Sequence, residues 1–172
     1  VLEKTGYSLL FDYLSHGLDL SGSETNRRFG KTLSLALGTY EISPLEAVQL
    51  HSMLVNGGRY VQPWGMRTVK DYEGNVVWDH EAEMKKIIDS KRREYGTIID
   101  PAAAAVTMNI LKGVLKPGGT GYGAASAYGL DFPAAGKTGT STDYNDAWFI
   151  GYTSDAVSAV WIVTSRPPVS FS

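Results

Sequence analysis

The segment AAGKTGTSTDYNDAWFIGYT, residues 134–153, predicts two β-strands separated by a turn over residues 142–146. A further apolar run follows a second short turn at residues 154–155. The three predicted strands are 134–141, 147–153 and 157–164. Because both connections are short, we expect an antiparallel meander at this end of the chain.

Helical signals precede this sheet at residues 7–16, 43–56 and 100–115. The second segment has the clearest signal: Ser43 is a capping residue, Pro44 follows at the first helical position, and Glu46 comes three residues after the cap. Helices followed by an antiparallel sheet predict an α+β fold, with the sheet packed against helices.

The intervening segments are predicted to be irregular or extended. Residues 18–33 are expected to be loop with a turn or two of helix, and residues 59–61 a short strand. The other expectations are two strands at 66–72 and 76–78, an exposed connection at 81–97, and a flexible glycine-rich loop at 119–129.

Composition excludes several classes of function. The chain has 172 residues, a formal net charge of -2 and no cysteine. This charge gives no basis for nucleic-acid binding, and the absence of cysteine excludes disulfides and thiolate metal sites. The histidines are isolated, so we expect no metal and no cofactor. No apolar run approaches the ~20 residues of a membrane helix, so membrane contact would come only through segments absent from this chain.

Lys137 is the residue that most needs an explanation. A lysine within a strand of small residues is costly unless it faces water, a partner or an anionic ligand. Thr138 and Thr140 alternate along the strand and therefore project to one side. One cation, two hydroxyls and accessible strand amides suit a peptide that carries a carboxylate. The plainer alternative is a hairpin with an exposed lysine.

Two nucleotide-binding patterns are only partly matched. Residues 131–138 nearly form a phosphate-binding loop, but Asp131 replaces the first glycine and a strand follows instead of a helix. The glycine cluster at 119–123 follows a helix and lacks dinucleotide spacing. Asp143 and Asp146 are interpreted as turn-capping residues, with Asp146 the better functional candidate because it opens the next strand.

The Lys137-Thr138-Gly139 triplet, within residues 134–153, resembles the third motif of class A (bifunctional) penicillin-binding proteins, in the penicillin-binding and serine β-lactamase-like superfamily. SLALG at 34–38, SPLE at 43–46 and NGG at 56–58 resemble the same family. The resemblance covers nearly the whole chain. It implies that residues 1–172 are the C-terminal portion of a single transpeptidase domain, with an incomplete β-lactamase-like fold.

The chain departs from the family because it contains no Ser-x-x-Lys and no Ser-x-Asn. The resemblance implies that the nucleophilic serine and the second motif precede Val1, in the N-terminal half of the domain. The usual closing helix is also missing after residues 161–163. We therefore expect this chain to be unable to form an acyl-enzyme alone.

By resemblance, the intact domain is a D-Ala-D-Ala transpeptidase that cross-links peptidoglycan through a serine acyl-enzyme and is acylated by β-lactams. Its partners would be peptidoglycan stem peptides, β-lactams and the missing half of the domain. Its location would be extracytoplasmic, in the periplasm or on the outer face of the bacterial cytoplasmic membrane. A serine β-lactamase and a non-catalytic β-lactam sensor or scaffold are the alternatives.

The resemblance also implies roles for individual residues. Lys137 would supply positive potential near the substrate carboxylate and order the second-motif serine, and the Thr138 and Thr140 hydroxyls would bind that carboxylate. The Thr140 amide would be one oxyanion-hole donor. Gly139 would let the substrate backbone approach, and Ser141 would complete the substrate-binding strand. Lys137 and Thr140 are thus the expected catalytic residues. Trp148 and Phe149 are assigned to packing.

Overall fold

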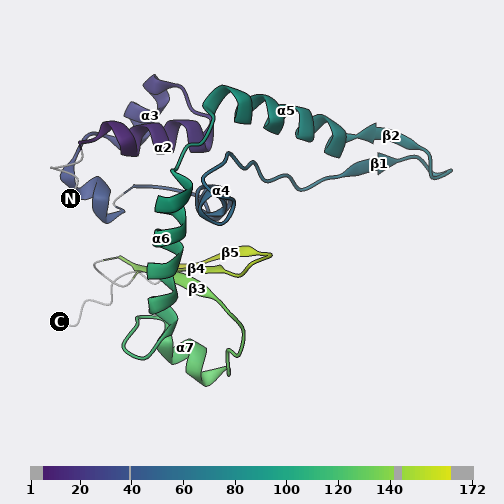
Figure 1. Cartoon of the computed structure of the whole chain (residues 1–172). Helices are drawn as coiled ribbons and strands as arrows, with labels where there is room; N and C mark the ends of the chain where they lie inside the picture. The colour runs from purple at the N-terminus through teal and green to yellow at the C-terminus, as the bar shows by residue number, and fades with distance from the viewer. Residues whose placement is uncertain (1–5, 39, 142–144, 164–172) are drawn as a thin grey trace, which may run out of the picture. The chain divides into compact units, whose positions relative to one another are not determined.

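The computed structural model describes residues 6–38, 40–141 and 145–163, which fall into two units, Val1–Ala104 and Ala105–Ser172. The first unit is mainly helical, and Figure 1 shows its β1–β2 hairpin running directly into helix α5. Its elements are α2 (Ser8–Leu18), α3 (Gly22–Phe29), η1 (Leu33–Leu37), α4 (Pro44–Val55), β1 (Thr68–Lys70), β2 (Val76–Asp79) and α5 (His80–Tyr95).

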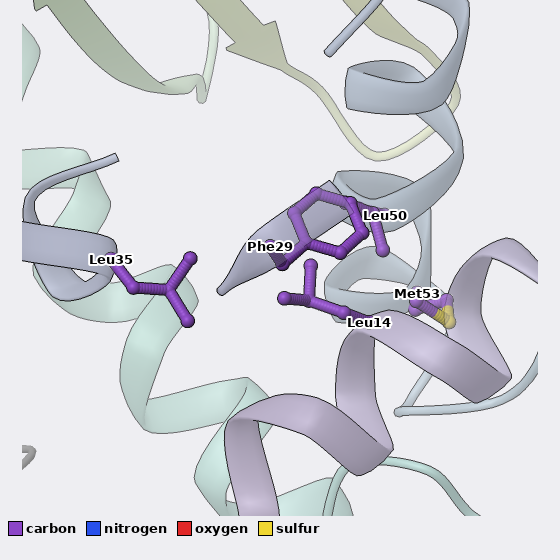
Figure 2. Close-up of a cluster of buried hydrophobic side chains, with 5 residues drawn as sticks. All are labelled: Leu14, Phe29, Leu35, Leu50 and Met53. Carbon is purple, nitrogen blue, oxygen red and sulfur yellow. The ribbon is translucent and has the colours of Figure 1, made fainter. Parts of the chain in front are cut away.

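The core of the first unit is a cluster of apolar side chains from α2, α3, η1 and α4 (Figure 2). The buried members are Leu14, Phe29, Leu35, Leu50 and Met53. These residues come from four separate segments, so their removal from water is the main force that holds the helices together. Helix α3, which provides Phe29, is the short helix of a turn or two predicted within residues 18–33.

Helix α4 begins as predicted. Ser43 Oγ accepts a hydrogen bond of 3.2 Å from the Glu46 amide, and Glu46 Oε2 accepts one of 2.9 Å from the Ser43 amide. Glu46 Oε1 also accepts a bond of 2.8 Å from Arg28. The capping box therefore also connects α4 to α3.

Helix α5 replaces the irregular connection predicted at residues 81–97, although most of these residues are exposed, as predicted. Its cap is Asp79, whose side chain accepts a hydrogen bond of 3.0 Å from the Ala82 amide. Only Met84 and Ile88 are buried, and they lie one turn apart on the same face. A largely charged helix with so narrow an apolar stripe has the composition of a solvated loop, which explains the wrong prediction.

Gly58 joins the end of α4 to the segment before α6. Its carbonyl accepts hydrogen bonds from the amides of Ile98 and Ile99, at 2.9 and 3.1 Å. Gly58 has φ +78°, and a Cβ there would lie 1.7 Å from the Ile99 carbonyl oxygen. Only glycine fits this position. The strand predicted at 59–61 is reduced to one isolated bridge, between Arg59 and Thr97.

Helix α6 (Pro101–Leu111) lies within the helix predicted at residues 100–115 and extends from the first unit into the second. The second unit continues with η2 (Lys112–Leu115), α7 (Tyr122–Ala127), β3 (Ala135–Thr140), β4 (Asp146–Tyr152) and β5 (Val157–Val163). The short helix α7 lies within the segment predicted to be a flexible loop at 119–129, so that prediction is wrong in part.

The three strands form an antiparallel sheet in the order β3–β4–β5, as predicted. Residues 142–144 of the predicted turn and residue 164 of the last predicted strand lie outside the described residues. Together with the helices, this sheet confirms the α+β class. No helix within the described residues has the length and apolar character needed to cross a membrane.

Candidate functional site

Strand β3 lies at the edge of its sheet. It pairs with β4 on one side, with Lys137 opposite Ile150, Thr138 opposite Phe149 and Gly139 opposite Trp148. Among the strands that the structure describes, none pairs with its other side. An unpaired strand edge offers a row of backbone N–H and C=O groups to an extended peptide.

The hydrogen-bond pattern shows which backbone groups face this open edge. The Ser141 amide donates to the Asp146 carbonyl at 3.1 Å, so the backbone groups of Ser141 point toward β4. Successive residues of an antiparallel strand alternate in this direction. The N–H and C=O groups of Thr138 and Thr140 therefore point away from β4, toward the open edge.

Lys137 is exposed, and its ammonium reaches the same edge. Its side chain leaves the opposite face of the strand from Thr138, yet Nζ donates a hydrogen bond to the Thr138 carbonyl. The long stem of lysine makes this possible. A cation and the outward amides of Thr138 and Thr140 thus lie along one strand edge, and the Thr140 side chain is also exposed.

Two glycines of β3 pack closely against aromatic side chains of β4. A Cβ on Gly136 would lie 2.9 Å from Cζ of Phe149, and a Cβ on Gly139 would lie 3.2 Å from Cβ of Trp148. The aromatic side chains of β4 therefore occupy the space that these glycines leave, which agrees with the packing role predicted for Trp148 and Phe149.

Ser141 and Asp146 close the hairpin between β3 and β4. The Asp146 amide donates to Ser141 Oγ at 3.0 Å, and Trp161 Nε1 donates to Asp146 Oδ1 at 2.8 Å. The rings of Trp148 and Trp161 stack with centroids 5.6 Å apart. These contacts give Asp146 a structural role as a hairpin residue. Asp143 lies outside the described residues.

Thr120 lies near the site, and sequence reasoning assigned it no role there. Its Oγ1 lies 2.7 Å from Oγ1 of Thr138, within hydrogen-bonding distance. Thr120 follows η2, which packs against β3. The two threonines are eighteen positions apart in the sequence, with no periodic signal that would pair them, and the glycines around Thr120 suggested flexibility.

The geometry argues against the nucleotide-binding alternative. Lys137 and Thr138 lie within strand β3, whereas a phosphate-binding loop places these residue types at the start of a helix. Within the described part of the chain, no three His, Asp or Glu side chains are grouped closely enough to hold a metal ion.

Comparisons with known proteins identify a related family. Residues 3–168 match the family described as "Penicillin binding protein transpeptidase domain". Penicillin-binding protein 1A of Neisseria gonorrhoeae is 35% identical over 148 residues, which cover 82% of this chain and 17% of that protein. Penicillin-binding protein 2D of Bacillus subtilis is 32% identical, with 80% of this chain and 20% of that protein covered. The chain thus spans about a fifth of the length of these relatives.

Solved structures show a similar fold. The penicillin-binding protein PonA1 of Mycobacterium tuberculosis aligns with a TM-score of 0.60 at 23% identity, covering 77% of this chain and 33% of that one. A structure of PonA1 in complex with penicillin V aligns with a TM-score of 0.54 at 18% identity, covering 88% of this chain and 44% of that one.

Proposed function

Because this chain belongs to the penicillin-binding protein transpeptidase domain family, we propose that it supplies the Lys-Thr-Gly strand of a D-Ala-D-Ala transpeptidase. The observation that carries this proposal is the open edge of β3. The Lys137 ammonium and the outward amides of Thr138 and Thr140 meet there, and the two threonine side chains project from the adjoining face, an arrangement that suits an extended peptide ending in a carboxylate.

The peptide would bind as an added strand along β3. Its backbone would pair with the N–H and C=O groups of Thr138 and Thr140 that point away from β4. The hydroxyls of Thr138 and Thr140 would donate to its terminal carboxylate, with the ammonium of Lys137 close by. Hydrogen bonds to an ionised acceptor are stronger than bonds between neutral groups, so the carboxylate would fix the register.

The Thr140 amide would stabilise the transition state. When a serine oxygen attacks the carbonyl carbon of the D-Ala-D-Ala bond, that carbonyl oxygen gains negative charge, and an amide aimed at it stabilises this charge. The bond to the terminal D-Ala then breaks, and its nitrogen takes up the serine proton. An amine of a neighbouring strand then attacks the resulting ester, the bond to the serine oxygen breaks, and that oxygen takes up a proton from the attacking amine.

The nucleophile would come from outside these 172 residues, since they contain no Ser-x-x-Lys. We propose that both units belong to one transpeptidase domain, of which residues 1–172 are the C-terminal portion. The match over residues 3–168 supports this, because it extends across the boundary between the units. The domain would act on stem peptides outside the bacterial cytoplasmic membrane and would be attached to it through other segments.

The test is acylation by a fluorescent penicillin of the protein that includes the nucleophile-bearing half. Lys137→Ala should slow labelling about 10- to 100-fold, because hydrogen bonds to charged groups are among the stronger ones. Lys70→Ala, which removes an exposed lysine on β1, is the matched control. Labelling of Lys137→Ala at the wild-type rate would contradict the role of Lys137. Rapid deacylation would favour the β-lactamase alternative, and the 172-residue chain alone should remain unlabelled.

A further inference from the structure

The contact between Thr120 and Thr138 has no role in the proposed function so far. The two Oγ1 atoms lie 2.7 Å apart, so one hydroxyl donates to the other. Each threonine has one hydroxyl proton and can also accept. The direction of this bond therefore decides whether the proton of Thr138 is available to a ligand.

Backbone hydrogen bonds hold the connection on either side of Thr120 in a tight turn. The Gly119 amide donates to the Lys116 carbonyl at 2.8 Å, and the Gly121 amide donates to the Val114 carbonyl at 2.9 Å. A Cβ on Gly119 would lie 2.3 Å from the Gly113 carbonyl oxygen. Glycine on each side of Thr120 thus allows the chain to fold tightly onto η2, which packs against β3.

We propose that Thr120 is a positioning residue that directs the Thr138 proton toward the carboxylate of the bound peptide. This inference rests on the proposed function. An ionised carboxylate only accepts hydrogen bonds, so Thr138 must donate to it. The single hydroxyl proton of Thr138 is then used in the bond to the carboxylate. In the 2.7 Å contact Thr138 Oγ1 can therefore only accept, and Thr120 must be the donor. Thr120 would act through Thr138 without touching the peptide.

The experiment compares variants of the protein that includes the nucleophile-bearing half, labelled with a fluorescent penicillin that keeps its carboxylate. Thr120→Val retains the shape of the side chain but removes the donor, and should slow acylation about five- to tenfold. Thr120→Ser retains the donor and should restore the rate to within about twofold of the wild type. Thr68→Val, at an exposed threonine of β1, is the control.

Two further measurements separate positioning from a general structural effect. The double variant Thr120→Val/Thr138→Val should be no slower than Thr138→Val, because Thr120 acts only through Thr138. With the methyl ester of the same penicillin, which lacks the ionised acceptor, the loss caused by Thr120→Val should shrink to about twofold or less. The melting temperature of each variant reports folding independently.

Each outcome decides a different point. If Thr120→Val is acylated at the wild-type rate, or loses the same factor with the acid and the ester, Thr120 is not a positioning residue while the proposed function stands. If Thr120→Ser is as slow as Thr120→Val, the hydroxyl is not the relevant group and the inference is again overturned. If the wild type is not labelled at all, the proposed function fails, and this inference fails with it.

Discussion

Trp161 Nε1 donates a hydrogen bond of 2.8 Å to Asp146 Oδ1, which ties β5 to the start of β4 where the chain leaves the candidate site. Trp161→Phe would keep a ring to stack on Trp148 but remove the donor. We expect it to lower the free energy of unfolding by about 1 kcal/mol. Urea denaturation measures this change. Asp146→Ala should lower the free energy of unfolding by a similar amount. The loss in the double variant should be clearly smaller than the sum of the two single losses. Additive losses would show that this hydrogen bond does not contribute to stability.

The Thr140 amide can be tested by proline substitution. Thr140→Pro removes an N–H that points to the open edge, so it breaks no bond to β4, and proline is tolerated at such edge positions. If this amide stabilises the oxyanion, acylation of the protein that includes the nucleophile-bearing half should fall about 10²–10³-fold. Thr140→Ala keeps the amide and should be affected much less. Equal rates for the two variants would contradict the oxyanion role.

Gly58 should be the glycine of the first unit least tolerant of substitution. A Cβ there would lie 1.7 Å from the Ile99 carbonyl oxygen, so the backbone must move and the bonds from Ile98 and Ile99 weaken. We expect Gly58→Ala to lower the free energy of unfolding, measured by urea denaturation, by about 3 kcal/mol or more. Gly57→Ala is the matched control, since Gly57 also has positive φ, +62°, but open space around it. Its cost should be about 1 kcal/mol.

The ion pair between Lys91 Nζ and Asp19 Oδ1, at 2.6 Å, predicts a loss of stability in acid. Burial raises the pKa of Asp19, but hydrogen bonds from Lys91 and Tyr95 outweigh it, and the net pKa is below its ordinary value. The folded state therefore binds this proton less readily than the unfolded state. The stabilisation is fully present above the ordinary pKa of Asp and is lost as the pH falls through the lowered value.

Asp19→Asn should therefore flatten the decline in stability below about pH 4. Asn is a suitable replacement because Asp19 has φ +55°, and both residue types tolerate left-handed backbone. The measurement is the free energy of unfolding between neutral and strongly acidic pH. Asp12→Asn, at an exposed residue of helix α2, which ends just before Asp19, controls for the change in net charge. An unchanged acid slope in Asp19→Asn would refute the prediction.

The sequence predicted best where local chemistry decides the structure. The signals at Ser43, Pro44 and Glu46 place α4 because capping groups satisfy amides within one turn. The strands of residues 134–163 follow from short turns between β-forming runs. The family could be recognised from the sequence because its motifs are contiguous, so no knowledge of packing was needed. The match to the family over residues 3–168 confirmed it.

The predictions were wrong or incomplete where residues far apart in the sequence determine the local structure. Helix α5 depends on burying Met84 and Ile88, and nothing in a run of charged residues shows what will cover that stripe. The contact between Thr120 and Thr138 depends on how a glycine-rich turn folds onto η2 and how η2 packs against β3. Both are tertiary effects, which local patterns do not encode.

A strand edge open to a peptide is also open to another copy of the same protein, and such edges promote aggregation. The ammonium of Lys137 covers the Thr138 carbonyl, one of the groups through which two copies would pair. If two β3 strands aligned antiparallel about Lys137, their ammonium groups would face each other and repel. The charge proposed to attract an anionic peptide end would therefore also help to keep the protein from self-association.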